Sequence, residues 1–244
     1  MTVTCARRDS GTTLLAIIDD PLSIPMQQIT ETKWRIVCRQ HAQEQAQTEA
    51  QRKWQIEPGR LLPFNYRWEH VQEVVRLALW LARTLGADLE IVEAAAWLHD
   101  VRKEQPQHAL AGAEAAVQIL PTTDFPVSKI ATVAEVIRKH EGMLRPKHAD
   151  PLLPLEAAIL WDADKLSKLG VQALALLLSS ENLIGQTLAE RRLGFEGFVH
   201  NTLNRTVKSM NTPPARQVAE QRYNSMVTML NTWAEEELVY NSKE

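Results

Sequence analysis

A histidine–aspartate pair, His99-Asp100, ends an apolar run whose residues recur at helical spacing. His70 lies upstream of this pair, and Asp162 and Asp164 follow it in the segment WDADKL. Imidazole and carboxylate side chains form the mixed nitrogen and oxygen ligand set that suits divalent transition metals and Mg²⁺. The residue types and their order therefore predict a metal site, and with it a metal-dependent hydrolase.

Helical geometry turns these side chains toward one side. His99 follows Ala95 by four residues on the apolar face, and Asp100 projects about 100° further round the same helix end. Asp164 follows Leu160 by four residues and so also faces inward. Because a buried, unpaired carboxylate is costly, two carboxylates and two imidazoles facing a core require a compensating cation. A divalent metal supplies that charge and lowers the pKa of a bound water toward neutrality.

Each of these residues also has a purely structural explanation. A single inward-facing histidine is more often a hydrogen-bonded core residue than a ligand, and Asp100 could cap the turn that follows it. The set taken together is harder to attribute to chance than any one member.

Two further histidines lie in the same region. His108 begins a predicted helix in HALAGAEAA, and His140 ends another in IRKHEG. Either could bind a second metal, an arrangement common in phosphoryl transfer. Either could instead act as a general acid or contact a phosphate, and a capping or surface role is an equal alternative.

Several cations are candidates for binding a substrate phosphate. Lys103 follows Asp100 by three residues, so it lies one turn away if the helix continues. Weaker candidates of the same type are Arg102, Lys139, Arg145 and Lys147. For the last two we favour a solvated surface position, and Lys165 could simply pair with Asp164.

The elements that position these residues are predicted to be helices. Apolar spacing predicts helices over about residues 66–85, 88–100, 108–120 and 127–140, one starting near residue 155, and a last one over about 214–238. Gly86 fits the end of the first of these and Asp88 the cap of the next. Strand signals are scarce, so we expect an all-α bundle, in which ligand sites are built from several helices.

The N-terminal part has a different composition. Residues 1–30 contain Pro21 and Pro25 and are expected to form a loosely ordered lead-in. Residues 31–55 favour helix by composition, but their apolar stripe is thin. We therefore expect an exposed helix there, or one that packs on a partner.

Bulk composition bounds the class of protein. The 244 residues are 45% hydrophobic and 23% charged, with a net charge of −3, so no global basic field attracts nucleic acid or an anionic membrane. The two cysteines, Cys5 and Cys38, are too few for a disulfide framework and favour a cytoplasmic location. No apolar run reaches the roughly eighteen residues of a transmembrane helix.

Five segments carry a resemblance to a known family: YRWEHVQEVVRLALWLA, AAAWLHDVRKE, HALAGAEAA, IRKHEG and EAAILWDADKLSKLG. With them the chain resembles the HD-domain metal-dependent phosphohydrolase superfamily, over about residues 60 to 240. Its C-terminal part, from FVHNTLNRTV onward, resembles the tail of small bacterial HD proteins of the YedJ/YpgQ type. Those proteins are similar to pyrophosphohydrolases that release pyrophosphate from nucleoside triphosphates.

The resemblance implies a ligand set for one divalent ion: His70, His99, Asp100 and one aspartate of DAD. The Ala-Asp-x-Leu context of related members selects Asp164, with Asp162 as the second choice. Families with extra histidines use them for a second metal, which would involve His108 and His140. The sequence departs from many relatives at Ser167, where they carry aspartate, and its first sixty residues match none of them.

These observations together predict an HD-type all-α bundle at residues 59–244, preceded by a partly helical N-terminal extension at residues 1–58. We expect it to cleave a phosphoester or phosphoanhydride of a nucleotide with a water activated by Mn, Mg, Co, Fe or Ni. The predicted metal ligands are His70, His99, Asp100 and Asp164. The predicted catalytic residues are Asp100, Lys103, His108 and His140, with Lys103 and Arg102 binding substrate.

Three alternatives stay open at this point. The chain could be a non-catalytic module that senses a nucleotide, a scaffold that uses its residue 31–55 helix, or a redox di-metal oxygenase. A homodimer is compatible with the sequence.

Overall fold

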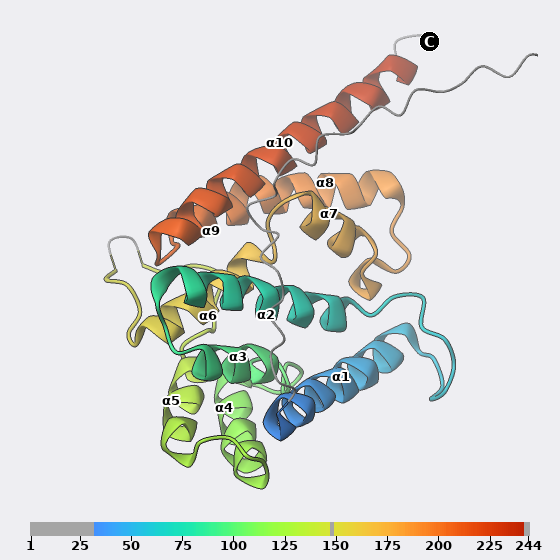
Figure 1. Ribbon diagram of the computed structural model, residues 1–244. Coiled ribbons are helices and arrows are strands. Elements are labelled where there is room, and N and C mark those ends of the chain that lie inside the picture. The colour runs from blue at the N-terminus through green and yellow to red at the C-terminus, as the bar shows by residue number, and fades with distance from the viewer. Residues whose placement is uncertain (1–31, 147–148, 242–244) are drawn as a thin grey trace, which may run out of the picture. The chain divides into compact units, whose positions relative to one another are not determined.

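The computed structural model describes residues 32–146 and 149–241. Helices and no strands form in this part of the chain, which confirms the predicted all-α fold (Figure 1). The α-helices are α1 (Lys33–Trp54), α2 (Tyr66–Leu85), α3 (Leu89–Leu98), α4 (His108–Ile119), α5 (Val127–Arg138), α6 (Leu155–Leu166), α7 (Val171–Leu178), α8 (Leu188–Phe198), α9 (Asn204–Lys208) and α10 (Pro213–Asn241). Short 3₁₀ turns, η1 (Leu120–Thr122) and η2 (Glu181–Leu183), and a π-helical turn, η3 (Val199–Leu203), complete the described elements.

Helix α2 lies at the centre of the bundle and contacts α1, α3, α6, α7 and α10 (Figure 1). Its residues Val74, Ala78 and Leu81 are fully buried at the i, i+4, i+7 spacing of an amphipathic helix. Helices α4 and α5 pack on each other, and α3 lies between this pair and α2. Three neighbouring helices, α2, α3 and α6, therefore meet in the core.

The helix ends follow local sequence signals. The Asn65 side chain accepts a hydrogen bond from the Trp68 amide at the start of α2, and Gly86 ends that helix with φ +70°. Asp88 caps α3 by accepting from the amides of Glu90 and Ile91. These ends confirm the predicted boundaries, and they fix where the side chains of His70 and His99 enter the core.

Helix α1 differs from the sequence expectation. One face of it is buried: Trp34, Cys38, Ala42, Ala46 and Ala50, four residues apart, lie against α2 and α3. The stripe is thin in apolar bulk because its residues are mostly alanine, and small side chains let two helices approach closely. The expectation of an exposed helix is therefore wrong.

This packing also bears on the predicted boundary at residue 58. Among the described residues, those from Thr32 onward form one compact unit, and the boundary at residue 58 stays a prediction. The predicted lead-in at residues 1–30 lies outside the described residues, as do Cys5 and Lys147. In the described part of the chain, no helix is both long and apolar enough to cross a membrane.

Candidate metal centre

The His99-Asp100 pair lies in the interior because α3 is buried along most of its length. Helix α3 ends at Leu98, and the next residues turn away without continuing the helix. His99 is fully buried and Asp100 is 5% exposed. The end of an apolar helix thus delivers an imidazole and a carboxylate to the core.

Helices α2 and α6 bring the other two predicted ligands to this point. His70 Nε2 lies 3.6 Å from Asp100 Oδ2 and 3.3 Å from Asp164 Oδ1, and His99 Nε2 lies 3.5 Å from Asp100 Oδ2. The structure therefore brings together all four residues that the sequence suggested as ligands, from three helices.

His108 and His140 join the same cluster from α4 and the end of α5. Their Nε2 atoms lie 3.8 Å and 3.6 Å from Asp100 Oδ1. Within the described residues, two groups have ligand atoms close enough to share an ion: His70, His99 and Asp100, and Asp100, His108 and His140. Asp100 belongs to both groups, so the geometry accommodates one divalent ion, or two with Asp100 between them.

Four buried polar atoms in this cluster have no hydrogen-bond partner in the described structure. They are Nε2 of His70, His99 and His140, and Oδ1 of Asp100. Buried polar atoms are almost always hydrogen-bonded, and an unsatisfied one costs about 1–3 kcal/mol. They lie around Asp100 in the two groups just described, so these residues fit one or two divalent cations, which would satisfy these atoms.

A hydrogen bond at Nδ1 of each ring determines which ring nitrogen is left to bind a metal. His99 Nδ1 and His140 Nδ1 lie 2.8 Å and 2.6 Å from the carbonyl oxygens of Ala96 and Ile137. A carbonyl only accepts, so each Nδ1 carries the proton. In the neutral ring, Nε2 then presents a lone pair to the cluster, as a metal ligand must.

Ser167 fixes the proton of His70 on Nδ1 in the same way. Its hydroxyl donates to the Asp164 carbonyl at 2.7 Å, which leaves its oxygen to accept from His70 Nδ1 at 3.0 Å. Ser167 stands where many relatives carry aspartate, and here a neutral hydroxyl holds the ring. The sequence marked this position as a departure but gave no indication of this role.

Electrostatics keep the carboxylates charged and the buried imidazole neutral. Burial lowers the pKa of His99 to about 3. Burial alone would raise the pKa of Asp100, but His99 and the Arg67 guanidinium hold it well below its ordinary value. Burial alone would also raise the pKa of Asp164. Lys165 and Lys168 outweigh that effect and hold its pKa well below the ordinary value.

Asp164 differs from the other predicted ligands in its partners. Both lysines bond its carboxylate, and Lys165 also donates to the His140 carbonyl at 2.8 Å. Of the cluster's imidazoles, it contacts His70. The ion pair between Lys165 and Asp164 that the sequence suggested is therefore present. The role of Asp164 as a metal ligand stays a prediction.

Asp162, the second choice, has a different environment. Its Oδ1 accepts from the Asn211 amide and side chain at 2.8 Å and 2.9 Å, and its Oδ2 accepts from the Thr212 amide and hydroxyl at 2.8 Å. These four bonds anchor the segment that leads into α10. Because no oxygen of Asp162 is left over, the geometry favours Asp164.

Arg67 and Glu49 belong to the site and were missed by sequence reasoning. Arg67 Nη1 donates to Asp100 Oδ2 at 2.5 Å, while its Nε and Nη2 donate to Glu49 at 2.8 Å and 3.2 Å. Glu49 comes from α1, whose Gln- and Ala-rich sequence gave no signal that it reaches the centre. A buried ion network thus ties α1 to the carboxylate that the two ligand groups share.

The cluster opens on the side of Lys103. Its Nζ lies 3.3 Å from Asp100 Oδ1 and 3.0 Å from His108 Nε2. A cavity of about 240 Å³ lies beside it, lined by Gln45, Glu49, Asp100, Val101, Arg102, Lys103, Glu104 and Gln105. Lys103 and Arg102 are therefore placed where a ligand would approach Asp100.

The weaker cationic candidates lie elsewhere. Lys139 pairs with Glu135 at 2.6 Å and donates to the Leu153 carbonyl. Arg145 bonds Asn211 and the Asp150 carbonyl. Neither contacts the cluster.

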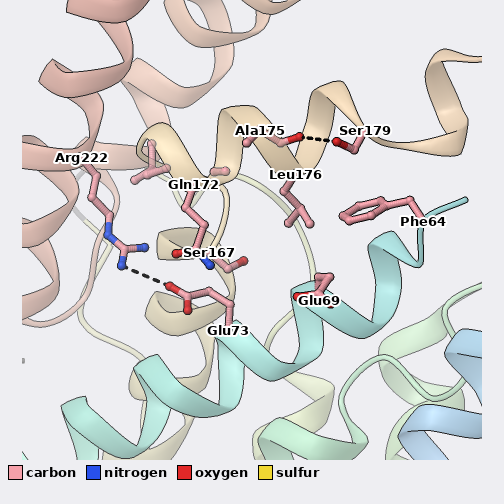
Figure 2. A pocket seen from close by; sticks show the side chains of 11 residues that line it. Phe64, Glu69, Glu73, Ser167, Gln172, Ala175, Leu176, Ser179 and Arg222 are labelled. Carbon is pink, nitrogen blue, oxygen red and sulfur yellow. Dashed lines mark hydrogen bonds and ion pairs between the residues drawn. The ribbon is translucent and has the colours of Figure 1, made fainter. Parts of the chain in front are cut away.

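A separate cavity of about 210 Å³ lies between α2, α7 and α10, with Ser167 on its wall (Figure 2). Figure 2 shows Glu73 and Arg222 paired on one side and Leu176 and Phe64 on the other. Arg222 Nη2 donates to Glu73 at 3.2 Å. Ser167, whose hydroxyl contacts His70 Nδ1, connects the wall of this cavity to the metal centre.

Comparison with known proteins is consistent with this geometry. The HD domain family model matches residues 67–169. The chain is 28% identical over 165 residues to the uncharacterized protein YpgQ of Bacillus subtilis, covering 67% of this chain and 80% of that protein.

Two solved structures share the fold. The crystal structure of Bacillus subtilis YpgQ in complex with ADP aligns with a TM-score of 0.56 and 24% identity, over 79% of this chain and 96% of that one. A predicted HD superfamily hydrolase from an uncultured Thermotogales bacterium aligns with a TM-score of 0.51 and 26% identity, over 80% and 92%. The resemblance drawn from the sequence is confirmed: residues 67–169 match the HD domain family model, and the chain is similar to YpgQ and to an HD superfamily hydrolase that shares its fold.

Proposed function

We propose that this protein is a metal-dependent phosphohydrolase that cleaves a phosphoester or phosphoanhydride bond of a nucleotide. The observation that carries the proposal is the convergence of three unpartnered imidazole nitrogens on the ionised Asp100. Mn, Mg, Co, Fe and Ni are all compatible with such ligands. A divalent cation held there would supply Lewis acidity and a water of lowered pKa.

The cations at the opening would bind the substrate. Lys103 and Arg102 line the cavity beside Asp100, and their charges suit phosphate oxygens on which negative charge develops. The Lys103 side chain is 35% exposed, so it can exchange its bond to Asp100 for one to a phosphate. The 240 Å³ cavity admits a phosphate group directly next to the cluster.

The two extra histidines suit ligand roles better than proton donation. Burial and the neighbouring Lys103 lower the pKa of His108, which favours its neutral form near pH 7. His140 has its Nδ1 proton fixed on a carbonyl and its Nε2 free and buried. We therefore assign both to a second ion or to direct contact with a phosphate, rather than to general-acid catalysis.

A nucleotide is the substrate class best supported. YpgQ, which shares the fold, was crystallised in complex with ADP. We extend nucleotide binding to this chain on that basis and on the placement of Lys103 and Arg102.

The test is hydrolysis of nucleoside mono-, di- and triphosphates with each of the five metals, comparing wild type with His99→Gln. We expect turnover that requires metal and is lost in the variant, and the product, phosphate or pyrophosphate, identifies the bond cleaved. The matched control is His200→Gln, because His200 is exposed on η3.

Circular dichroism and bound-metal analysis separate a loss of chemistry from a loss of fold. A folded, metal-loaded wild type that hydrolyses no nucleotide would contradict the proposal and favour a nucleotide-sensing module. Oxygen consumption with iron would favour the oxygenase instead.

A further inference from the structure

A third cavity lies where residues 144–146, 149 and 151 face α9 and the start of α10. Its volume is about 590 Å³, within the range typical of small-molecule sites. None of the residues that line it is a predicted metal ligand. It is therefore a separate feature from the opening beside Asp100.

All the charged residues that the structure places on the wall of this cavity are cations. Four of its lining residues are Arg145, Arg205, Lys208 and Arg216, and among the described residues no carboxylate lines it. Arg205 and Lys208 lie three residues apart on α9 and are exposed, so one helix face presents both. Arg216 comes from the first turns of α10 and Arg145 from the facing segment.

These positive charges are not neutralised locally. The hydrogen bonds that Arg145 and Arg216 make go to neutral acceptors: the Asn211 side chain and the carbonyls of Asp150 and Met210. Asp162, which is connected to Arg145 through Asn211, has both carboxylate oxygens engaged by Asn211 and Thr212. In a chain of net charge −3, four cations around one cavity, with no acid among the described residues that line it, are an unbalanced local charge.

The cavity wall is held in place before any ligand arrives. The Asn211 side chain accepts from Arg145 and from the Leu152 amide at 3.1 Å, and it donates to Asp162 at 2.9 Å. This links Arg145 and Leu152 to α6 and to the start of α10. Two of the four cations, Arg145 and Arg216, are therefore held by hydrogen bonds before a ligand arrives, which lowers the entropic cost of binding.

We propose that this cavity binds a small organic anion carrying two or more phosphate groups, such as a nucleotide. Guanidinium groups match phosphate oxygens bidentately, and Lys208 adds a point charge. Leu144, Pro146, Pro151 and Met210 supply apolar contact for the rest of the ligand. A concave space of this size suits a small molecule better than an extended nucleic-acid backbone.

Two sources could provide the phosphates. They could belong to a second, free molecule, or to the far end of the molecule whose other end lies at the metal centre. The chemistry is the same in both cases, and the experiment below distinguishes them.

The direct test is calorimetric titration of the full-length protein with inorganic tripolyphosphate in EDTA, which removes any ion from the metal centre. We expect wild type to bind, with an affinity that falls as salt is raised. The double variant Arg205→Gln/Lys208→Gln should bind about tenfold more weakly or worse. The control Arg60→Gln/Arg83→Gln removes two exposed cations elsewhere and should bind as wild type does.

A second arm measures nucleotide hydrolysis with metal added. If the phosphates belong to the substrate, the double variant raises KM while kcat is unchanged. If a free molecule occupies the cavity, KM is unchanged and tripolyphosphate binding alone is lost. The titration needs no turnover, so it decides the proposal even if the chain hydrolyses no nucleotide.

The proposal is overturned if the double variant matches wild type in both arms. It is also overturned if the control loses as much affinity as the double variant, because binding would then reflect only general charge.

Discussion

Replacing Arg67 with methionine tests the network that connects α1 to the metal centre. The Arg67 side chain is 10% exposed, and those of Asp100 and Glu49 are 2% and 5% exposed. Without the guanidinium, Asp100 retains Lys103 at 3.3 Å and Glu49 retains Lys53 at 2.6 Å. Removing one partner of a buried ion pair costs about 3–5 kcal/mol, because the remaining charge is left buried.

The assay is urea unfolding in EDTA, followed by far-UV circular dichroism. We expect Arg67→Met to lower the free energy of unfolding by about 3–5 kcal/mol. For a chain of this size that corresponds to a fall in Tm of roughly 6–20 °C. The exposed Arg60→Met is the matched control and should stay within about 0.5 kcal/mol of wild type.

Added Mn²⁺ should stabilise Arg67→Met more than wild type, because a cation next to Asp100 replaces part of the missing charge. A double-mutant cycle with Glu49→Gln should give a coupling of about 0.5–3 kcal/mol. A loss below about 1 kcal/mol, together with no coupling, would refute the argument that this network holds α1 and the site together.

Three further predictions concern single side chains. Ser167→Ala removes the hydrogen bond to His70 Nδ1 and should weaken metal binding by about 10–100-fold, as measured by calorimetry. An unchanged affinity, together with an unchanged histidine tautomer by ¹⁵N NMR, would contradict this prediction. Asp162→Asn should destabilise the fold but leave the bound-metal content unchanged, whereas Asp164→Asn should lower the metal content; the reverse pattern would exchange the two assignments. Asp88→Ala removes the α3 cap and should cost about 1 kcal/mol in urea unfolding. Burial opposes ionisation of Asp88, but Lys129 and two backbone amides hold its pKa below the ordinary value. The contribution of the ionised Asp88 to the free energy of unfolding is therefore complete above the unfolded pKa of about 3.9, and it is lost as the pH falls through the lowered folded-state pKa. If Asp88→Ala destabilised the protein equally at every pH, this part of the prediction would be wrong.

The sequence predicted well what depends on local periodicity. Helices α2 to α6 follow from apolar spacing, and the end of α2 and the start of α3 follow from Gly86 and Asp88, which act within a few residues. The convergence of His70, His99, Asp100 and Asp164 followed as well, because each lies on the buried side or at the buried end of its helix.

The parts that depend on packing between distant segments could not be predicted. The buried stripe of α1 is mostly alanine, with residues spaced four apart, and nothing in its sequence specifies the helices against which it packs. The Glu49–Arg67–Asp100 network depends on that packing and was missed with it. The choice between Asp162 and Asp164 likewise depended on Asn211 and Thr212, about fifty residues away in sequence.

The cations around the cluster explain how this cluster can exist before an ion is bound. Asp100 and Asp164 are buried and charged, so without compensation each would oppose folding. Arg67 and Lys103 contact Asp100, and Lys165 and Lys168 contact Asp164. The carboxylates therefore stay ionised and in place, while the Nε2 atoms of His70, His99 and His140 have no such compensation and remain unpartnered. The fold thus tolerates the unsatisfied nitrogens at a cost in stability, and binding a cation there would recover that cost as affinity.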